Sequence, residues 1–239
     1  RLLWKRKFAS LTLILQIVFS VTSLAQLFVF IVDHTDNVRA VNELPTENAV
    51  AVSTYDYCSP EQVEQQIEAS PLVDSIGKAY LGGLLFNDIS CNIAVYNAAV
   101  IERYTPKLQQ GSWFSDAAGA SGQEAAEAVV SSDTGLRPGD TASILLPSHK
   151  KLRIVVTGVL PTPTQYFFPS GTASPEYFAA NIVISQNSVF ILREADVADL
   201  TGLEEPATLL VFFKPEATQT DRDGLIAAWS RYLSLIHIS

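Results

Sequence analysis

The chain has 239 residues, with 16 Lys and Arg against 25 Asp and Glu and a formal net charge of −9. Hydrophobic residues make up 48% of it and charged residues only 17%. This apolar, charge-poor composition excludes a disordered or collagen-like chain. Because the chain begins at Arg1 and contains no methionine, we expect it to be an internal piece of a longer protein.

The negative charge is concentrated after residue 32. The first 32 residues contain no acidic residue, so residues 33–239 contain all 25 acidic groups and 12 of the 16 basic ones. A surface of this sign repels phosphate backbones and anionic headgroups, so nucleic acid is not expected as a partner. The other four basic residues are Arg1, Lys5, Arg6 and Lys7.

A membrane-spanning helix is predicted over residues 8–32. From Phe8 to Val32 the chain contains no charged residue, and a helix of this length exceeds the roughly 30 Å thickness of the hydrocarbon layer. The basic residues precede this run, while Asp33 and Asp36 follow it. The positive-inside rule therefore puts residues 1–7 in the cytoplasm and everything after residue 32 outside it, in a protein of the cell membrane.

A cleaved signal peptide is the alternative interpretation of this segment. Ser23 and Ala25 form a small-x-small cleavage site before Gln26. The apolar run is, however, longer than the 7 to 15 residues of a signal-peptide core. Both interpretations put the bulk of the chain outside the cytoplasm.

Polar residues recur along one face of the predicted helix, at spacings of four, four and three. Ser and Thr are tolerated in lipid because they bond to backbone carbonyls one turn back. An amide near the middle of a bilayer, as at Gln16, needs a partner and usually finds one on another helix. We therefore expect this face to pack against other spanning helices; its residues are Thr12, Gln16, Ser20 and Ser23.

Residues 33–233 are expected to fold as a two-lobed mixed α+β domain. Ser59-Pro60-Glu61-Gln62 has the pattern of a helix N-terminus, and Val63 and Ile67 supply the buried face of that helix. Alternating apolar residues predict a long strand from Ile93 to Ile101. The predicted helices cover residues 60–69 and begin again near 220, and the predicted strands cover 49–53, 93–101, 127–132, 141–146, 152–160, 181–185 and 207–213. Residues 148–151 are expected to join two of these strands as a hairpin.

Cys58 and Cys91 are the only cysteines. An even number of cysteines outside the cytoplasm favours a disulfide between them. Two buried free thiols, acting as small apolar residues, are the alternative. Neither cysteine has a second Cys or His within four residues, so a zinc site is not expected.

The segment from Pro161 to Phe178 combines four prolines with a group of aromatic residues. One interpretation is a long loop whose aromatic side chains fold back over a sheet. The other is an exposed surface that contacts a partner or an apolar cargo. The aromatic residues concerned are Tyr166, Phe167, Phe168, Tyr177 and Phe178.

The sequence offers no catalytic constellation. His34, His149 and His237 have no ligand neighbour three or four residues away, so no metal site is expected. Ser-x-x-Lys occurs at Ser75 and at Ser148, but such a short pattern arises by chance in a chain of this length. We expect no cofactor and no enzymatic activity.

Four short segments, in order along the chain, are similar to motifs of one family of membrane proteins. Ser70 to Ile76 is similar to the family's P-x-V-x-x-V segment, and Leu108 to Phe114 to its L-x-x-G-R-x-F stretch, with Ser112 in place of the Arg. Residues 136–144 resemble its G-D-x-I-x-I turn and strand, and residues 152–160 the strand that follows. Each match is short, and their order along the chain gives them weight together. In this order the chain resembles the extracytoplasmic domains of ABC-transporter permeases of the MacB/FtsX type.

This resemblance implies a permease without chemistry of its own. A separate cytoplasmic ABC ATPase would hydrolyse ATP, and a dimer of permeases would transmit the motion to ectodomains inserted between the first and second spanning helices. The work done outside would be export, lipoprotein release or a cell-wall-related task, with an extracytoplasmic protein as a further partner. Residues 234–239 are expected to be a truncated or non-native tail.

Two other functions stay open on the sequence. One is a single-span membrane-anchored sensor or ligand-binding protein without a transport partner. The other is an extracytoplasmic enzyme, which would need polar residues converging in one pocket.

Overall fold

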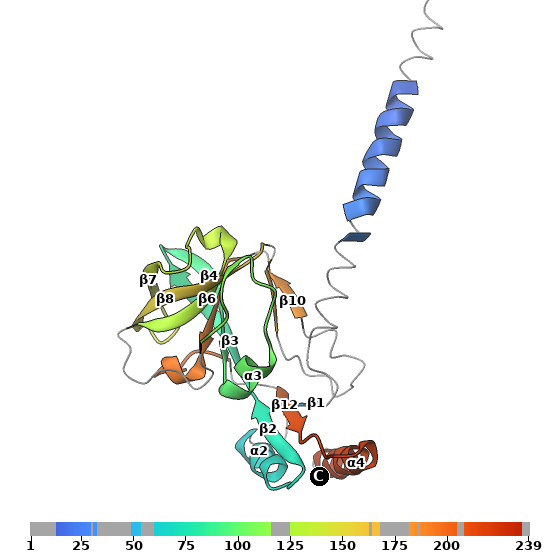
Figure 1. The fold of residues 1–239 in the computed structure, drawn as a ribbon, viewed down its shortest axis with the longest axis vertical. Helices are drawn as coiled ribbons and strands as arrows, with labels where there is room; N and C mark the ends of the chain where they lie inside the picture. The colour runs from blue at the N-terminus through green and yellow to red at the C-terminus, as the bar shows by residue number, and fades with distance from the viewer. Residues whose placement is uncertain are drawn as a thin grey trace, which may run out of the picture. The chain divides into compact units, whose positions relative to one another are not determined.

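A computed structural model describes residues 13–29, 31–32, 49–53, 60–115, 125–162, 164–167, 182–185, 187–204 and 208–235. The chain forms two compact units, Arg1–Asn42 and Glu43–Ser239. In the first unit, residues 13–29 and 31–32 are helical (Figure 1), and the large apolar side chains are 40% to 75% exposed. Within the described residues, no helix is both long enough and apolar enough to cross a membrane.

The polar face predicted on this segment is helical where the structure describes it. Gln16, Ser20 and Ser23 lie in the helix and are exposed, whereas Thr12 lies outside the described residues. Thr22 Oγ1 donates a hydrogen bond of 2.8 Å to the carbonyl of Val18, one turn back, which is how a hydroxyl is satisfied without an outside partner. The packing role of the polar face stays a prediction.

The second unit contains a small antiparallel sheet in the order β1-β12-β2. Its strands are β1 (Ala49–Ser53), β12 (Thr208–Phe213) and β2 (Val73–Gly77). Helices α2 (Pro60–Glu68) and α4 (Gln219–Leu235) cover one face of it (Figure 1). Because side chains alternate along a strand, Leu209, Val211 and Phe213 of β12 pack with α2 and α4, and Leu210 and Phe212 pack on the opposite face. We call these elements the small lobe.

A larger sheet closes on itself as a barrel. Its order is β5-β8-β6-β11-β4-β3-β7, and β7 pairs with β8 as well as with β3. The strands are β3 (Ala79–Phe86), β4 (Ile89–Tyr96), β5 (Gln110–Gly111), β6 (Ala126–Ser131), β7 (Thr141–Leu145), β8 (Lys151–Leu160) and β11 (Val189–Arg193). We call these seven strands, with α3 (Ala98–Arg103), the barrel lobe.

Two apolar clusters fill the barrel lobe. One joins alternate side chains of β4, β6, β8 and β11, among them Ile93, Ala128, Ile154 and Phe190. The other lies over the opposite face of the strands and includes Val100 and Tyr104 from around α3, together with Leu210 and Phe212 of the small lobe. The second cluster therefore joins the two lobes.

The expected α+β architecture is confirmed, and most predicted elements occur within a residue or two of their expected bounds. The hairpin between β7 and β8 is confirmed by the pairing of Leu145 with Lys151. The strand predicted from Ile93 to Ile101 is wrong in its second half, since β4 ends at Tyr96 and α3 begins at Ala98. Strands β2, β3, β5 and β11 were not predicted, nor was a strand over residues 164–167.

The aromatic segment is partly corrected. Residues 164–167 form β9 (Thr164–Phe167), which pairs with β10 (Ile182–Ser185). Tyr166 is only 6% exposed and belongs to the cluster that joins the lobes, so it is not part of an exposed contact surface. Burial raises the pKa of its phenol. The side chain of Phe167 and all of Phe168, Tyr177 and Phe178 lie outside the described residues.

Of the two cysteines of the predicted disulfide, the structure describes Cys91. Cys91 is a free thiol, 2% exposed, and its Sγ lies 3.6 Å from the carbonyl oxygen of Ile89, to which it donates. Burial raises the pKa of this thiol. A free, buried Cys91 agrees with the alternative of a buried thiol and not with the predicted disulfide; Cys58 lies outside the described residues.

Candidate functional site: the junction between the lobes

The chain connection from β2 of the small lobe to β3 of the barrel lobe is a single residue. Strand β2 of the small lobe ends at Gly77 and strand β3 of the barrel lobe begins at Ala79, which leaves only Lys78 between them. A one-residue connection leaves few backbone torsions in which a hinge could form. The relative orientation of the lobes therefore depends on what surrounds Lys78.

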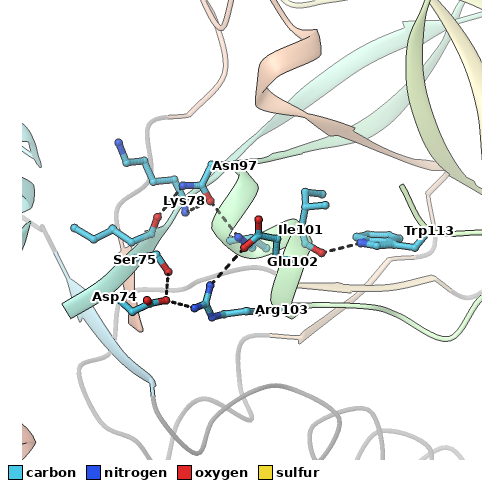
Figure 2. A network of polar contacts seen from close by, with 10 residues as sticks. Asp74, Ser75, Lys78, Asn97, Ile101, Glu102, Arg103 and Trp113 are labelled. Atoms are coloured by element: carbon cyan, nitrogen blue, oxygen red, sulfur yellow. Dashed lines mark hydrogen bonds and ion pairs between the residues drawn. The ribbon is translucent and has the colours of Figure 1, made fainter. Parts of the chain in front are cut away.

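Asn97 holds this connection in place (Figure 2). Its Oδ1 accepts hydrogen bonds from the backbone N–H of Lys78 (3.0 Å) and of Val100 (3.3 Å), and its Nδ2 donates to the carbonyl of Ile76 (2.7 Å). The backbone N–H of Asn97 donates to the carbonyl of Lys78 (3.1 Å). One amide side chain thus caps the start of α3 and binds the backbone on both sides of Gly77.

Helix α3 packs directly on the small sheet at Gly77. A Cβ at Gly77 would lie 2.9 Å from a methyl carbon of Val100, 3.0 Å from the Phe212 ring and 3.1 Å from the Cβ of Leu210. Any side chain at this position would therefore push α3 away from the sheet. The glycine lets the apolar cluster continue from one lobe to the other.

Two ion pairs cross the junction. Arg103 at the end of α3 pairs with Asp74 of β2, and its guanidinium lies 4.5 Å from the centroid of the Phe212 ring. Lys78 pairs with Glu64 of α2. The side chains are 21% to 39% exposed, so each pair contributes at most about 1 kcal/mol and is weakened by salt. The stacking of Arg103 on Phe212 adds a contact that depends on the planar guanidinium.

Trp113 ties the segment after α3 to the same junction. Its Nε1 donates a 3.0 Å hydrogen bond to the carbonyl of Ile101 (Figure 2). Its ring meets Tyr104 edge-on at 6.0 Å and Phe114 at 4.8 Å. This bond satisfies a carbonyl at the end of α3 that has no partner within the helix.

Three of the segments that carry the sequence resemblance, residues 108–114, 136–144 and 152–160, pack against one another. Gly111 of β5 lies opposite Gly158 of β8. With φ at +77°, a Cβ on Gly111 would lie 2.2 Å from the carbonyl oxygen of Thr157 and 2.9 Å from the Pro138 ring, and a Cβ on Gly158 would lie 2.7 Å from the carbonyl oxygen of Ser112. Both glycines are thus needed for backbone packing. Ser112 is exposed, so replacing the family's Arg there leaves this packing unchanged.

The glycine-aspartate turn of the third segment is also structural. Asp140 Oδ2 accepts a 2.8 Å hydrogen bond from the backbone N–H of Arg137. The carbonyl of Asp140 accepts from Val156, and Gly139, with φ at +92°, donates to the carbonyl of Val156. The turn therefore fixes the start of β7 against β8.

A buried ionic cluster lies in the wall of the barrel. Arg193 is 1% exposed; its Nη1 lies 3.1 Å from Glu127 Oε2 and its Nε 2.7 Å from Asp196 Oδ2. Ser115 Oγ donates to Glu127 (3.1 Å), and the guanidinium lies 5.4 Å from the centroid of the Phe114 ring. The cluster connects β6, β11 and the segment after β5.

The structure does not bring the other sequence candidates together. His149 has φ at +60° in the β7–β8 turn, and Lys78 of the first Ser-x-x-Lys pattern pairs with Glu64. Among the described residues, no group of three His, Cys, Asp or Glu side chains could hold a metal ion. His34 and His237 lie outside the described residues.

Sequence reasoning missed Asn97 and Arg103. An Asn before the run Ala98-Ala99-Val100 is a helix-cap signal, but the alternating apolar residues concealed it. The partners of Asn97 lie 19 and 21 residues away along the chain, and no local pattern indicates them.

No family model matches the chain, and no curated protein matches it. Among solved structures, it is similar to the periplasmic region of MacB from Actinobacillus actinomycetemcomitans, at 11% identity over 81% of this chain and 86% of that chain, with a TM-score of 0.49. It is also similar to the extracellular domain of the noncanonic ABC-type transporter YknZ from Gram-positive bacteria, at 10% identity over 71% and 85%, with a TM-score of 0.42.

Proposed function

We propose that residues 43–235 form the extracytoplasmic domain of an ABC-type permease. The observation that carries this proposal is the pairing of the first strand with the last. Strands β1 and β12 are antiparallel neighbours, with Ala49 opposite Phe212. The chain therefore enters the small sheet and leaves it at the same end.

This arrangement suits a domain inserted between two membrane helices, because the chain enters and leaves the small sheet at one end and only α4 separates β12 from the end of the described residues. A ligand-binding domain on a single span needs only one such connection, so the pairing favours the permease over the membrane-anchored sensor. The four segments that resemble the permease family support the same choice, since they lie in β2, β5, β7 and β8 and three of them pack against one another.

The proposal includes a spanning helix over residues 8–32, with residues 1–7 in the cytoplasm. The uncharged run from Phe8 to Val32 and the basic residues before it support this. Exposed apolar side chains along residues 13–29 agree with it, because exposed surfaces of this kind mark a membrane or protein contact.

The mechanism we propose is mechanical. A cytoplasmic ATPase supplies the energy, a second permease provides the opposing ectodomain, and the small lobe receives the motion through its two chain connections. The one-residue link at Lys78, the Asn97 hydrogen bonds and the shared apolar cluster would make the barrel lobe follow the small lobe as one body. No step on this chain forms or breaks a covalent bond.

Two measurements test the proposal. In cells expressing the full-length protein, with Cys58 and Cys91 replaced by Ala, a membrane-impermeant maleimide should label Ser143→Cys without permeabilisation and Lys5→Cys only after it. Ser143 is an exposed residue of β7. The opposite labelling would refute the topology.

The second measurement concerns the partner. The full-length protein purified in mild detergent should retain an ATP-hydrolysing subunit. Correct topology without any such subunit would favour the sensor over the permease.

A further inference from the structure

The buried ionic cluster of the barrel wall lies in the same row of the sheet as the lobe junction. The register pairs Arg193 of β11 with Tyr96 of β4, and Tyr96 with Ala79 of β3. Paired residues on neighbouring strands are about 5 Å apart and point to the same face. Ala79 follows Lys78, the one-residue link, and Asn97 follows Tyr96. Because Ala79 and Tyr96 belong to the cluster that joins the lobes, the Arg193 side chain lies on the face that carries this cluster.

Four aromatic rings connect the Arg193 guanidinium with the end of α3. The guanidinium lies 5.4 Å from the centroid of the Phe114 ring, and Phe114 meets Trp113 edge-on at 4.8 Å. Trp113 meets Tyr104 edge-on at 6.0 Å, and Tyr104 meets Tyr96 in the same way at 6.2 Å. Contacts of this geometry are attractive beyond the apolar area that they bury. We call Phe114, Trp113, Tyr104 and Tyr96 the aromatic ladder.

The aromatic ladder ends at the groups that hold the lobes together. Trp113 Nε1 donates a 3.0 Å hydrogen bond to the carbonyl of Ile101 in α3 (Figure 2), and Tyr104 is the C-cap residue of the same helix. Between these two positions, Arg103 stacks on the Phe212 ring of the small lobe at 4.5 Å. The position of α3 against the small sheet therefore depends on rings that lead back to the barrel wall.

The aromatic ladder has little room to yield. Tyr104 and Phe114 are only 7% and 8% exposed. A close-packed interior passes a displacement on, because it contains few voids that could absorb it. Arg193 is held from its other side by the carboxylates of Glu127 and Asp196. Moving the guanidinium requires these ion pairs to rearrange, and the rings packed against it move with it.

We propose that Arg193 is a positioning residue for the lobe junction and acts through the aromatic ladder. The ionic cluster fixes the Phe114 ring, the ladder fixes the end of α3, and α3 fixes how the barrel lobe sits on the small sheet. A load on the barrel wall that displaces the guanidinium changes how firmly the lobes are held together. This coupling is a property of the folded domain, so it goes beyond the proposed function and fails or succeeds independently of it.

Amide hydrogen exchange of the full-length protein in mild detergent, followed by mass spectrometry, tests this coupling. The readout is the exchange of α3 and of Lys78, whose N–H is bonded to Asn97. Exchange of β7, which contributes no residue to the ladder, reports on the rest of the barrel lobe. Phe114→Leu removes the ring and keeps an apolar side chain. It should speed exchange of α3 and Lys78 by about three- to tenfold, the equivalent of one lost aromatic contact, and leave β7 within about twofold.

Phe86→Leu is the matched control. Phe86 makes an edge-on contact of the same kind with Phe190 in the barrel lobe, at 5.4 Å, but it is not part of the ladder. This variant should leave exchange of α3 and Lys78 within about twofold of the parent protein. An equal rise at the junction in Phe86→Leu and Phe114→Leu would overturn the proposal. A Phe114→Leu effect that is equal in α3 and β7, or absent, would overturn it as well.

Arg193→Lys tests the other end of the ladder. It keeps the positive charge beside Glu127 and loses the planar guanidinium over the Phe114 ring. Exchange of α3 and Lys78 should again rise at least about threefold. Combined with Phe114→Leu, the lysine should add less than about a further twofold, because both substitutions break the same contact. Unchanged exchange at the junction in Arg193→Lys, or two effects that multiply in the double variant, would refute the role given to the guanidinium.

Discussion

Asn97→Ala is the sharpest test of the lobe junction. The substitution removes three side-chain hydrogen bonds, to the backbone of Lys78, Val100 and Ile76. Each contributes about 1 kcal/mol net, and the loss of a helix cap is included in the bond to Val100. Because Asn97 is half-buried, water replaces only part of what is lost, and we expect the free energy of unfolding to fall by about 2 to 4 kcal/mol.

Thermal unfolding of residues 43–239, the second compact unit, measures this change. For a domain of this size, 1 kcal/mol shifts the Tm by roughly 2 to 4 °C, so Asn97→Ala should lower the Tm by about 5 to 15 °C. Asn97→Asp keeps both acceptor bonds but turns a carboxylate oxygen toward the carbonyl of Ile76 in place of the donor, so its cost should be close to that of the alanine. Gln66→Ala, on the exposed face of α2, is the control and should stay within about 0.5 kcal/mol.

Two tryptophans report on the lobes separately. Trp113 is bonded to the end of α3, and Trp229 of α4 stacks on Phe213 in the small lobe at 6.1 Å. Fluorescence of single-tryptophan variants should give one common midpoint in the parent and two separate midpoints after Asn97→Ala. The reasoning is refuted if Asn97→Ala behaves like Gln66→Ala, or if Asn97→Asp is tolerated as well as Gln66→Ala.

Three further outcomes follow from the geometry. Gly111→Ala should lower the free energy of unfolding by about 3 kcal/mol or more, because its Cβ would lie 2.2 Å from a backbone carbonyl oxygen. Gly135→Ala is the matched control, since Gly135 has a similar φ of +73° but open space around it. It should cost only about 1 to 2 kcal/mol. Arg193→Met should cost about 3 to 5 kcal/mol, since it leaves the carboxylate of Glu127 buried without its counter-charge. Chemical denaturation of the two glycine variants and of Arg193→Met measures these changes in the free energy of unfolding. Hydrogen bonds from Lys150 and Thr201 hold the pKa of Asp199 well below its ordinary value of 3.8. The folded state therefore favours the ionised carboxylate. The stabilisation from this carboxylate is present above pH 4 and is lost as the pH falls below 4. Asp199→Asn should therefore make the free energy of unfolding fall less steeply with decreasing pH below 4.

Each of these outcomes has a contrary result. Equal losses for the two glycine variants would mean that the contact with the neighbouring strand is not close. A tolerated methionine at Arg193 would mean that the carboxylate beside it is solvated. An unchanged acid limb in the Asp199 variant would mean that the carboxyl keeps its ordinary pKa.

Local sequence determined much of the secondary structure. The Pro60 signal starts α2 where expected, and Val63 and Ile67 are its buried residues. Strands β6, β7, β8 and β12 also follow from apolar runs bounded by turn residues. These signals succeed because they act over a few residues, at the period of the element itself.

The junction was decided by tertiary structure. The alternation from Ile93 to Ile101 favours a strand, but Asn97 ends it by bonding to backbone groups 19 and 21 residues earlier and starting α3. Strand β11 lies between β4 and β6, parallel to one and antiparallel to the other, and the barrel closes through β7. Composition and periodicity encode which residues avoid water, whereas strand order and the contact between lobes depend on partners distant along the chain, which only the folded chain brings together.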